Sequence, residues 1–405
     1  MTHPDFRSPA FLRDHMAAMI GFYHPRCVDP RGGYFQFYML DGAIHTPDAK
    51  ELVSSARMVV SYAMALRTLG TPGFDAALRH GVAFLRENHR QAKHGGYAWA
   101  LQWRDGCWQA SDASNQCYGF AFVALAFSHA ISAGVLDARA DLEAVYDLME
   151  AHFWDPAGGL YVEELDEDWM PLSQYRSQNA NMHACEAFLA AHEATGDAKY
   201  LERALLIARN LCVVQAEKTR GLVWEHYDRH WQPDFKYNFH DYSNIYRPWG
   251  YQVGHQTEWA KFLVHLHQRT GEKWLPGKAV SLFDRMLALG WDHQYGGFAY
   301  SIDDRLVPCN FEKYFWTQNE TACSAAIMAH ATGVEGYMDW HDRIWALCWD
   351  KLVDHKHGSW DRLFSRDWQL IAADKGPGGK DYHVIGACFD LLRLHKPAAG
   401  WAGAR

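Results

Sequence analysis

The chain has 405 residues, 49% of them hydrophobic, which is enough apolar material for a large buried core. Lysine and arginine number 39 against 48 aspartates and glutamates, and this net charge of −9, without a basic cluster, argues against nucleic acid or an anionic membrane as a partner. No apolar run reaches the ~18 residues of a membrane-spanning helix, and the first residues lack a signal-peptide pattern. Nine cysteines without a Cys-x-x-Cys pair indicate reduced thiols, so we expect a cytoplasmic protein.

A glycine-centred element recurs six times, starting at residues 32, 95, 158, 221, 296 and 358. Four of the five steps are 62 or 63 residues long, and the step from the fourth copy is 75. Aromatic and β-branched residues alternate after the glycines, and turn signals such as Asp41-Gly42 and Asp105-Gly106 follow. Each copy is therefore predicted to be a short β-hairpin, and the spacing predicts a repeat architecture.

Two helical patterns belong to each repeat, one before the hairpin and one after it. The patterns before the hairpins cover residues 9–25, 74–90, 138–153, 197–214, 273–289 and 335–352. Those after the hairpins cover residues 49–69, 112–134, 177–194, 250–270, 316–332 and 380–395. Four glycines are predicted to stand at the turns between helices: Gly70, Gly196, Gly271 and Gly333.

Twelve helices in six pairs, with no polar capping repeat at either chain end, predict a closed ring of helix pairs. This is the all-α (α/α)6 barrel, here a single domain over residues 1–405 with six repeats of about 63 residues. An open α-solenoid is the alternative, although open arrays usually need polar caps. In the barrel, the hairpins and the N-termini of the six second helices share one face, so we expect the active site there.

The early turns of the second helices carry polar and aromatic residues within otherwise apolar helices. Singly, each has a structural explanation: His183 as a core histidine, Trp316 as packing, Arg57 as half of an ion pair. Together they favour a pocket. The candidates are Arg57, Tyr118, Asn179, His183, His255, Glu258, Trp316, Glu320 and His383.

The strongest single signal is the stretch Gly254-His255-Gln256-Thr257-Glu258, which opens an apolar helical run. His255 and Glu258 are neighbours on one helix face because they are three residues apart. The positive end of the helix favours the neutral imidazole that a general base needs. An ordinary surface or core pair explains this stretch equally well when it is taken alone.

Other chemistries find less support. There is no Gly-x-Ser-x-Gly elbow and no Walker loop. A metal site could draw on His183, His255, Glu258 and His383, but these residues form no compact ligand motif, and we predict no metal and no cofactor. The fourth repeat is longer by about 12 residues within 217–249, an aromatic stretch that is a candidate lid or pocket wall.

Several motifs together resemble the N-acylglucosamine 2-epimerase superfamily over residues 10–395, and that resemblance also implies an (α/α)6 barrel. Residues 176–183 and 247–261 are most similar to its aldose–ketose isomerase branch, which acts on mannose-type sugars. The motifs are Arg57, Asn179-Ala180-Asn181-Met182-His183 with Glu186, Gly254-His255-x-x-Glu258, Phe315-Trp316-x-x-x-Glu320 and Asp381-Tyr382-His383.

The resemblance implies metal-free proton transfer at C2 of an open-chain sugar through a cis-enediol. His255 and His383 would be the acid/base pair, Glu258 would orient His255, and Arg57 would face the developing enediolate oxygens. The remaining candidates would bind the sugar: His183, Asn179, Tyr118, Trp316 and Glu320. A proton returned to C1 gives the ketose, and one returned to the other face of C2 gives the epimer.

The first function expected is therefore a mannose-type aldose–ketose isomerase acting on a small monosaccharide, as a monomer or homodimer. A 2-epimerase on free or N-acylated glucose-type sugars is the runner-up. An (α/α)6 glycoside hydrolase or lyase would need paired carboxylates, for which Glu225, Glu258 and Asp374 are the candidates. A catalytically silent carbohydrate-binding or scaffold protein is the fourth possibility.

Overall fold

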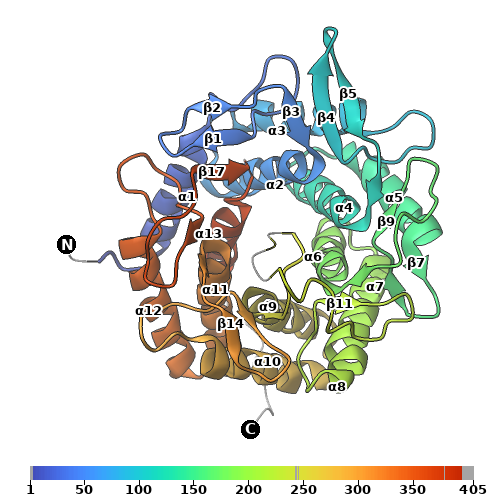
Figure 1. Cartoon of the computed structure of the whole chain (residues 1–405). Helices are drawn as coiled ribbons and strands as arrows, with labels where there is room; N and C mark the ends of the chain where they lie inside the picture. Colours follow the sequence, from blue (N-terminus) through green and yellow to red (C-terminus); the bar gives the residue numbers. More distant parts are fainter. Residues whose placement is uncertain (1–2, 242–243, 245, 378, 395–405) are drawn as a thin grey trace. The chain divides into compact units, whose positions relative to one another are not determined.

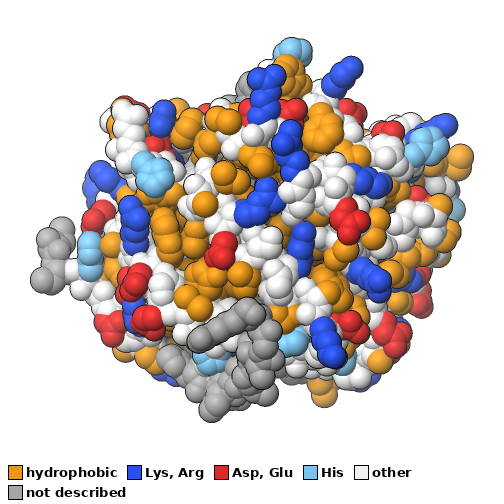
Figure 2. Space-filling view, turned by 90° about the horizontal axis from the view of Figure 1, so that it is seen from below, with side chains coloured by type: hydrophobic (Ala, Val, Ile, Leu, Met, Phe, Trp, Pro, Cys, Tyr) orange, Lys and Arg blue, Asp and Glu red, His pale blue; other side chains and the backbone are white. Residues whose placement is uncertain are grey.

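The computed structural model describes residues 3–241, 244, 246–377 and 379–394. Tyr242 of the predicted lid and residue 395 of the last predicted helix lie outside the described residues. Among the described helices, none is both long enough and apolar enough to cross a bilayer. On the face drawn in Figure 2, lysine and arginine side chains are interspersed with acidic and hydrophobic ones.

Contacts divide the chain into two compact units. The first, called here the N-terminal unit, comprises Ala17–Ile207 and Asp374–Ile385. The second, the C-terminal unit, comprises Met1–Met16, Ala208–Ala373 and Gly386–Arg405. The single domain predicted from the repeats stays a prediction.

The helices of the N-terminal unit pack as the repeats predict. The helix after each hairpin packs beside the next such helix, α2 against α4 and α4 against α6, and α3 and α5 pack on α2 and α4 (Figure 1). α1 and α7 each cross into the other unit at one end. The bounds are α1 Pro9–Tyr23, α2 Leu52–Leu69, α3 Phe74–Phe84, α4 Cys117–Ser132, α5 Ala138–Leu148, α6 Gln178–Thr195 and α7 Ala198–Arg209, with π-helical turns η1 Leu85–His89, η2 Met149–Phe153 and η3 Asn210–Gln215 after α3, α5 and α7.

The C-terminal unit repeats this pattern: α9 packs against α10 and α11, and α11 against α12. All four predicted glycine stops end their helices in the left-handed conformation: Gly70, Gly196, Gly271 and Gly333. The bounds are α8 Ala216–Lys218, α9 Val253–Thr270, α10 Trp274–Gly290, α11 Phe315–Thr332, α12 Glu335–Lys351 and α13 Tyr382–Arg393, of which α13 begins in the N-terminal unit.

Short antiparallel strands fix where the second helices begin. A hairpin alone is marginally stable, and here the strand that leads into a second helix pairs with the following hairpin. Thus β3 pairs with β4, β6 with β9, β12 with β13 and β15 with β16. The bounds are β1 Phe37–Met39, β2 Ile44–His45, β3 Ala49–Glu51, β4 Ala100–Arg104, β5 Cys107–Asp112, β6 Asn115–Gln116, β7 Trp154–Asp155, β8 Leu160–Tyr161, β9 Glu164–Leu165, β10 Arg176–Ser177, β11 His226–Tyr227, β12 Tyr251–Gln252, β13 Ser301–Ile302, β14 Pro308–Asn310, β15 Lys313–Tyr314, β16 Leu363–Phe364 and β17 Asp374–Pro377.

A buried side-chain amide ties each of three second helices to its own hairpin. Gln318 of α11 accepts a hydrogen bond from the Phe298 N–H at 2.7 Å and donates to the Phe298 carbonyl at 3.0 Å. Gln256 of α9 holds Val223 in the same way. Asn181 of α6 makes the equivalent pair of bonds to residue 161. These bonds satisfy hairpin groups that burial would otherwise leave without partners.

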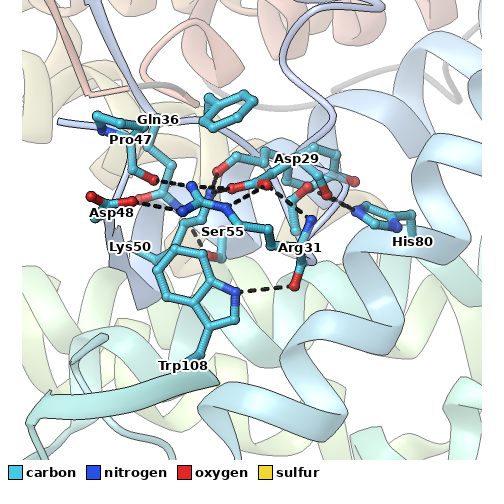
Figure 3. Close-up of polar contacts among 12 residues, drawn as sticks. Asp29, Arg31, Gln36, Pro47, Asp48, Lys50, Ser55, His80 and Trp108 are labelled. Carbon is cyan, nitrogen blue, oxygen red and sulfur yellow. Dashed lines mark hydrogen bonds and ion pairs between the residues drawn. The ribbon is translucent and has the colours of Figure 1, made fainter. Parts of the chain in front are cut away.

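A buried ion pair anchors the first hairpin to the strand before α2. Lys50 Nζ lies 2.9 Å from Asp29 Oδ2, and both side chains are fully buried. Arg31 joins Asp29 to Asp48, and the Trp108 indole donates to the Arg31 carbonyl (Figure 3). The C-terminal unit contains an equivalent pair, Lys313 with Asp292, 263 residues further along the chain.

Candidate active site

In the C-terminal unit, His255 occupies the first turn of α9. The pairing of Tyr251 and Gln252 with β13 fixes where this helix begins. The Nδ1 atom of His255 lies 2.9 Å from Glu225 Oε2, and the two side chains are only 9% and 3% exposed. Trp316, in the first turn of α11, places its ring 5.1 Å from the imidazole.

This contact determines the chemistry that His255 offers. Because a carboxylate can only accept, Nδ1 carries the shared proton and Nε2 becomes the basic nitrogen of the ring. The sequence interpretation assigned the orienting role to Glu258, three residues along the helix. The carboxylate at Nδ1 belongs to Glu225, and an orienting role for Glu258 stays a prediction.

Glu225 belongs to the longer fourth repeat, within the segment predicted as a lid or pocket wall. The neighbouring residue, His226, links this segment to the chain before α9, since His226 Nε2 lies 2.8 Å from the Pro248 carbonyl oxygen. Burial lowers the pKa of His226 to about 4, so its imidazole is neutral at neutral pH. Trp249 Nε1 also donates to the Phe235 carbonyl at 2.8 Å. The segment predicted as a lid or pocket wall therefore includes the carboxylate that contacts a candidate histidine.

Glycine is required beside this pair. A Cβ atom on Gly254 would come within 2.2 Å of the Trp316 ring. The missing side chain lets the indole pack closely over the start of α9, next to His255. Glu258 and Glu320 occupy the same position in α9 and α11, five residues after the first residue of each helix, and both are buried.

In the N-terminal unit, Arg57, Tyr118 and His183 come together from α2, α4 and α6. Arg57 Nη2 donates to the Tyr118 hydroxyl at 2.9 Å, and its guanidinium carbon lies 4.4 Å above the Phe122 ring. The His183 ring contacts the Tyr118 and Phe122 rings at 5.3 and 4.7 Å. His183 Nδ1 is 2.8 Å from Glu186 Oε2, so a second histidine is paired with a carboxylate.

His383 stands in the first turn of α13, 7% exposed, with its ring 4.3 Å from that of Tyr382. The residue before them holds the helix start, because Asp381 Oδ2 accepts a hydrogen bond from the Tyr23 hydroxyl at 2.6 Å. The Tyr382 ring lies 4.6 Å from the Arg57 guanidinium carbon, which joins α13 to the Arg57 group.

Asn179 and Asp374 are the two remaining residues that the sequence analysis named. Ser177 caps α6 by accepting from the Ala180 N–H, which places Asn179 in the first turn. The Oδ1 atom of Asn179 is buried and has no hydrogen-bond partner among the described residues. Asp374, a carboxylate considered for glycoside hydrolysis, accepts the Gly376 N–H within β17.

Five of the nine predicted residues belong to the N-terminal unit and four to the C-terminal unit. Those of the N-terminal unit are Arg57, Tyr118, Asn179, His183 and His383, and those of the C-terminal unit are His255, Glu258, Trp316 and Glu320. Sequence patterns did not assign Glu225 to His255, because 30 residues separate the two and only the folded loop brings them together. The sequence named Glu225 only as a carboxylate candidate for glycoside hydrolysis.

Known proteins resemble this chain along nearly its whole length. A D-mannose isomerase of Marinomonas mediterranea is 42% identical over 97% of this chain and 99% of that protein. A crystal structure of a D-mannose isomerase matches with a TM-score of 0.93 at 41% identity, over 97% of this chain and 100% of that chain. A cellobiose 2-epimerase from Bacillus thermoamylovorans matches in fold, with a TM-score of 0.84 at 16% identity over 95% of this chain and 100% of that chain.

These solved relatives are (α/α)6 barrel enzymes, so the predicted fold class is confirmed. A sequence model described as N-acylglucosamine 2-epimerase matches residues 33–387. The match spans most of the chain and agrees with the motifs that suggested this resemblance. The chain belongs to the N-acylglucosamine 2-epimerase family.

Proposed function

We propose that this protein is an aldose–ketose isomerase that interconverts mannose-type aldoses and fructose-type ketoses by histidine acid/base catalysis. The observation that carries the proposal is the buried contact of His255 Nδ1 with Glu225, which suits the imidazole to proton transfer. The 42% identity to a D-mannose isomerase supports the choice of sugar.

The reaction balances as two proton transfers. One of His255 and His383 takes the proton from C2 of the open-chain aldose, the electron pair forms the C1–C2 double bond, and O1 gains a proton. The resulting cis-enediol then loses the proton of its C2 hydroxyl, and C1 gains a proton, which leaves the ketone at C2. A positioned acid or base of this kind contributes roughly 10²–10⁴-fold.

The other candidates take roles that their chemistry allows. Arg57 supplies a fixed positive charge for the oxygens that become negative along the path, and its contacts with Tyr118 and Phe122 hold the guanidinium in place. His183, Asn179, Tyr118 and Glu320 bind sugar hydroxyls, and Trp316 packs on the sugar. Glu258 remains in the proposed acid/base group, without the role of holding Nδ1.

Proton NMR of mannose in D2O tests the reaction. We expect fructose to appear with deuterium at C1, because solvent exchanges with the catalytic group between the two transfers. Formation of glucose instead would support a 2-epimerase, the second candidate, which shares the first proton abstraction. If mannose stays unchanged, the protein is neither an isomerase nor a 2-epimerase acting on mannose.

Substitution of the two histidines tests the mechanism. His255→Asn and His383→Asn should each abolish turnover while circular dichroism and the unfolding temperature stay close to wild type. His267→Asn is a matched control, since His267 lies on the same helix as His255 and its Nδ1 atom lies 3.1 Å from the Glu272 carbonyl oxygen in the turn after the helix. Near wild-type turnover in either active-site variant would contradict the two-histidine mechanism.

The remaining expectations belong to the same proposal. Activity should persist in excess EDTA, and a loss that zinc, manganese or cobalt restores would indicate metal-assisted chemistry. A cytoplasmic location, no binding of nucleic acid or membranes, and a monomeric or dimeric state are likewise proposed. Cell fractionation, binding assays with nucleic acid and vesicles, and size-exclusion chromatography test them.

A further inference from the structure

A buried lysine lies on α9, the helix that also carries His255 and Glu258. Lys261 follows His255 by six positions on α9 and is 5% exposed. Its Nζ atom donates to Glu320 Oε2 of α11 at 2.8 Å and lies 3.8 Å from Asp390 Oδ2 of α13. Side chains from three helices, all at residues of the C-terminal unit, therefore meet at a single ammonium group.

The charges around Lys261 keep it protonated. Burial alone lowers the pKa of a lysine, but Glu320, Cys323, Asp390 and Glu258 together raise the pKa of Lys261 well above its ordinary value. The next basic group along the helix face is His265, whose pKa is lowered to about 3 by burial, Arg269, Lys261 and Arg393. His265 is thus neutral at physiological pH.

Two carboxylates, Glu320 and Asp390, lie within 4 Å of this cation, and the negative charge of Glu258 also raises its pKa. Moving a carboxylate from water into a protein interior costs several kcal/mol unless an opposite charge compensates it. Without Lys261, Glu320 would be a buried carboxylate close to two others, and such groups take up a proton at higher pH. The lysine is therefore in the position to hold Glu320 ionised.

We propose that Lys261 is a positioning residue whose ammonium group keeps Glu320 ionised and fixes its carboxylate for substrate binding. The inference rests on the proposed function, in which Glu320 binds the sugar. An ionised carboxylate only accepts hydrogen bonds, so a fixed Glu320 selects ligands that present hydroxyl hydrogens. Lys261 does not itself touch the reacting atoms in this account.

The test is the pH dependence of kcat/KM for mannose with Lys261→Met. The variant replaces the ammonium by an apolar chain of similar length. We expect at least a tenfold loss near pH 7 and a shift of the acidic limb to higher pH by about one unit or more, because the uncompensated carboxylate must lose its proton first. In the double variant Lys261→Met/Glu320→Gln, which carries a neutral amide, that acidic limb should disappear or return to its wild-type position.

Lys50→Met is the matched control. Lys50 is also a buried lysine paired with a carboxylate, Asp29, but it anchors a hairpin of the N-terminal unit (Figure 3). Its loss should lower stability and leave the acidic limb where it is in the wild type. If Lys261→Met does not fold, Lys261→Gln is measured by the same criterion.

The outcomes separate the two proposals. A wild-type protein that leaves mannose and related sugars unchanged overturns the proposed function. An active wild type whose acidic limb is the same in the folded Lys261 variants overturns the inference alone. An acidic limb that shifts in Lys261→Met and stays shifted in the double variant also overturns it, since Glu320 would then not be the responsible group.

Discussion

Replacing Glu225 by glutamine tests the contact on which the mechanism depends. Glu225 Oε2 lies 2.9 Å from His255 Nδ1, and both groups are buried, so water replaces little of what is lost. A hydrogen bond to a charged group contributes about 1.5–3 kcal/mol. If this stabilisation is realised when the imidazole becomes positive, its loss lowers kcat by about 10- to 150-fold.

Glutamine adds a second effect in the same direction. Its amide can donate as well as accept, so it can place the proton of His255 on the other ring nitrogen, which leaves no basic nitrogen toward the substrate. The assay is the initial rate of fructose formation over a range of mannose concentrations, which separates kcat from KM. Thermal unfolding of the same preparation shows whether the fold is retained.

Glu150→Gln is the control for this experiment. Glu150 is a partly buried carboxylate that accepts hydrogen bonds from Tyr161 and Arg203 and contacts no candidate histidine among the described residues. It should reduce stability and leave kcat near wild type. A Glu225→Gln protein whose kcat stays within about twofold of wild type would refute the argument that this carboxylate controls His255.

Three further changes follow from the structure. Gly254→Ala should lower kcat/KM at least tenfold, because the new methyl group would lie 2.2 Å from the Trp316 ring and must displace it; steady-state kinetics check this. Burial lowers the pKa of His89 to about 4, so between pH 6 and 4 the unfolded chain binds a proton at His89 that the folded chain does not bind. As the pH falls through this range, the free energy of unfolding should decrease by up to ~1.4 kcal/mol per pH unit from this group alone. Urea unfolding at several pH values measures this decrease. Gln318→Ala should cost about 2–4 kcal/mol in urea unfolding, since the buried N–H and carbonyl of Phe298 lose their partners.

Each of these changes has its own control. Gly277→Ala adds a methyl group in α10 with no heavy atom within 4 Å, so it should be neutral or slightly stabilising. His89→Gln should flatten the pH slope that His89 causes. Gln232→Ala removes an exposed glutamine and should change stability little. Wild-type kinetics in Gly254→Ala, an unchanged slope in His89→Gln, or a neutral Gln318→Ala would contradict the respective argument.

Much of the helical framework could be predicted from the sequence because its signals are local. Gly70 and Gly333, for example, end α2 and α11 where left-handed backbone is required. Helix starts were less accurate. The helix predicted from residue 112 begins at Cys117, because residues 107–112 form the second strand of a hairpin and residues 115–116 pair with residues 164–165, which are distant in sequence. Local patterns contain no information about the pairing of residues 115–116 with residues 164–165.

The candidate site shows the same division. His255, Glu258 and Glu320 were found because helical spacing and known motifs point to them. The contact of Glu225 with His255 could not be predicted, because it forms only in the folded loop. The burial of Lys261 could not be predicted either, because Lys261 lies among apolar residues of a helix. The role of a buried lysine can be inferred only when the positions of its carboxylate partners on other helices are known. A pattern in a single sequence does not give those positions.

The pairing of β17 with β1 limits how this protein can be divided for expression. Phe37 and Tyr38 pair with Pro377 and Gly376, and residues 374–385 belong to the same compact unit as residues 17–207. A truncated gene product ending near residue 207 would lack its third strand there and expose the β1 edge to intermolecular pairing and aggregation. Cloning strategies that aim at half of the molecule must therefore graft the late segment onto the early one, or keep the chain whole.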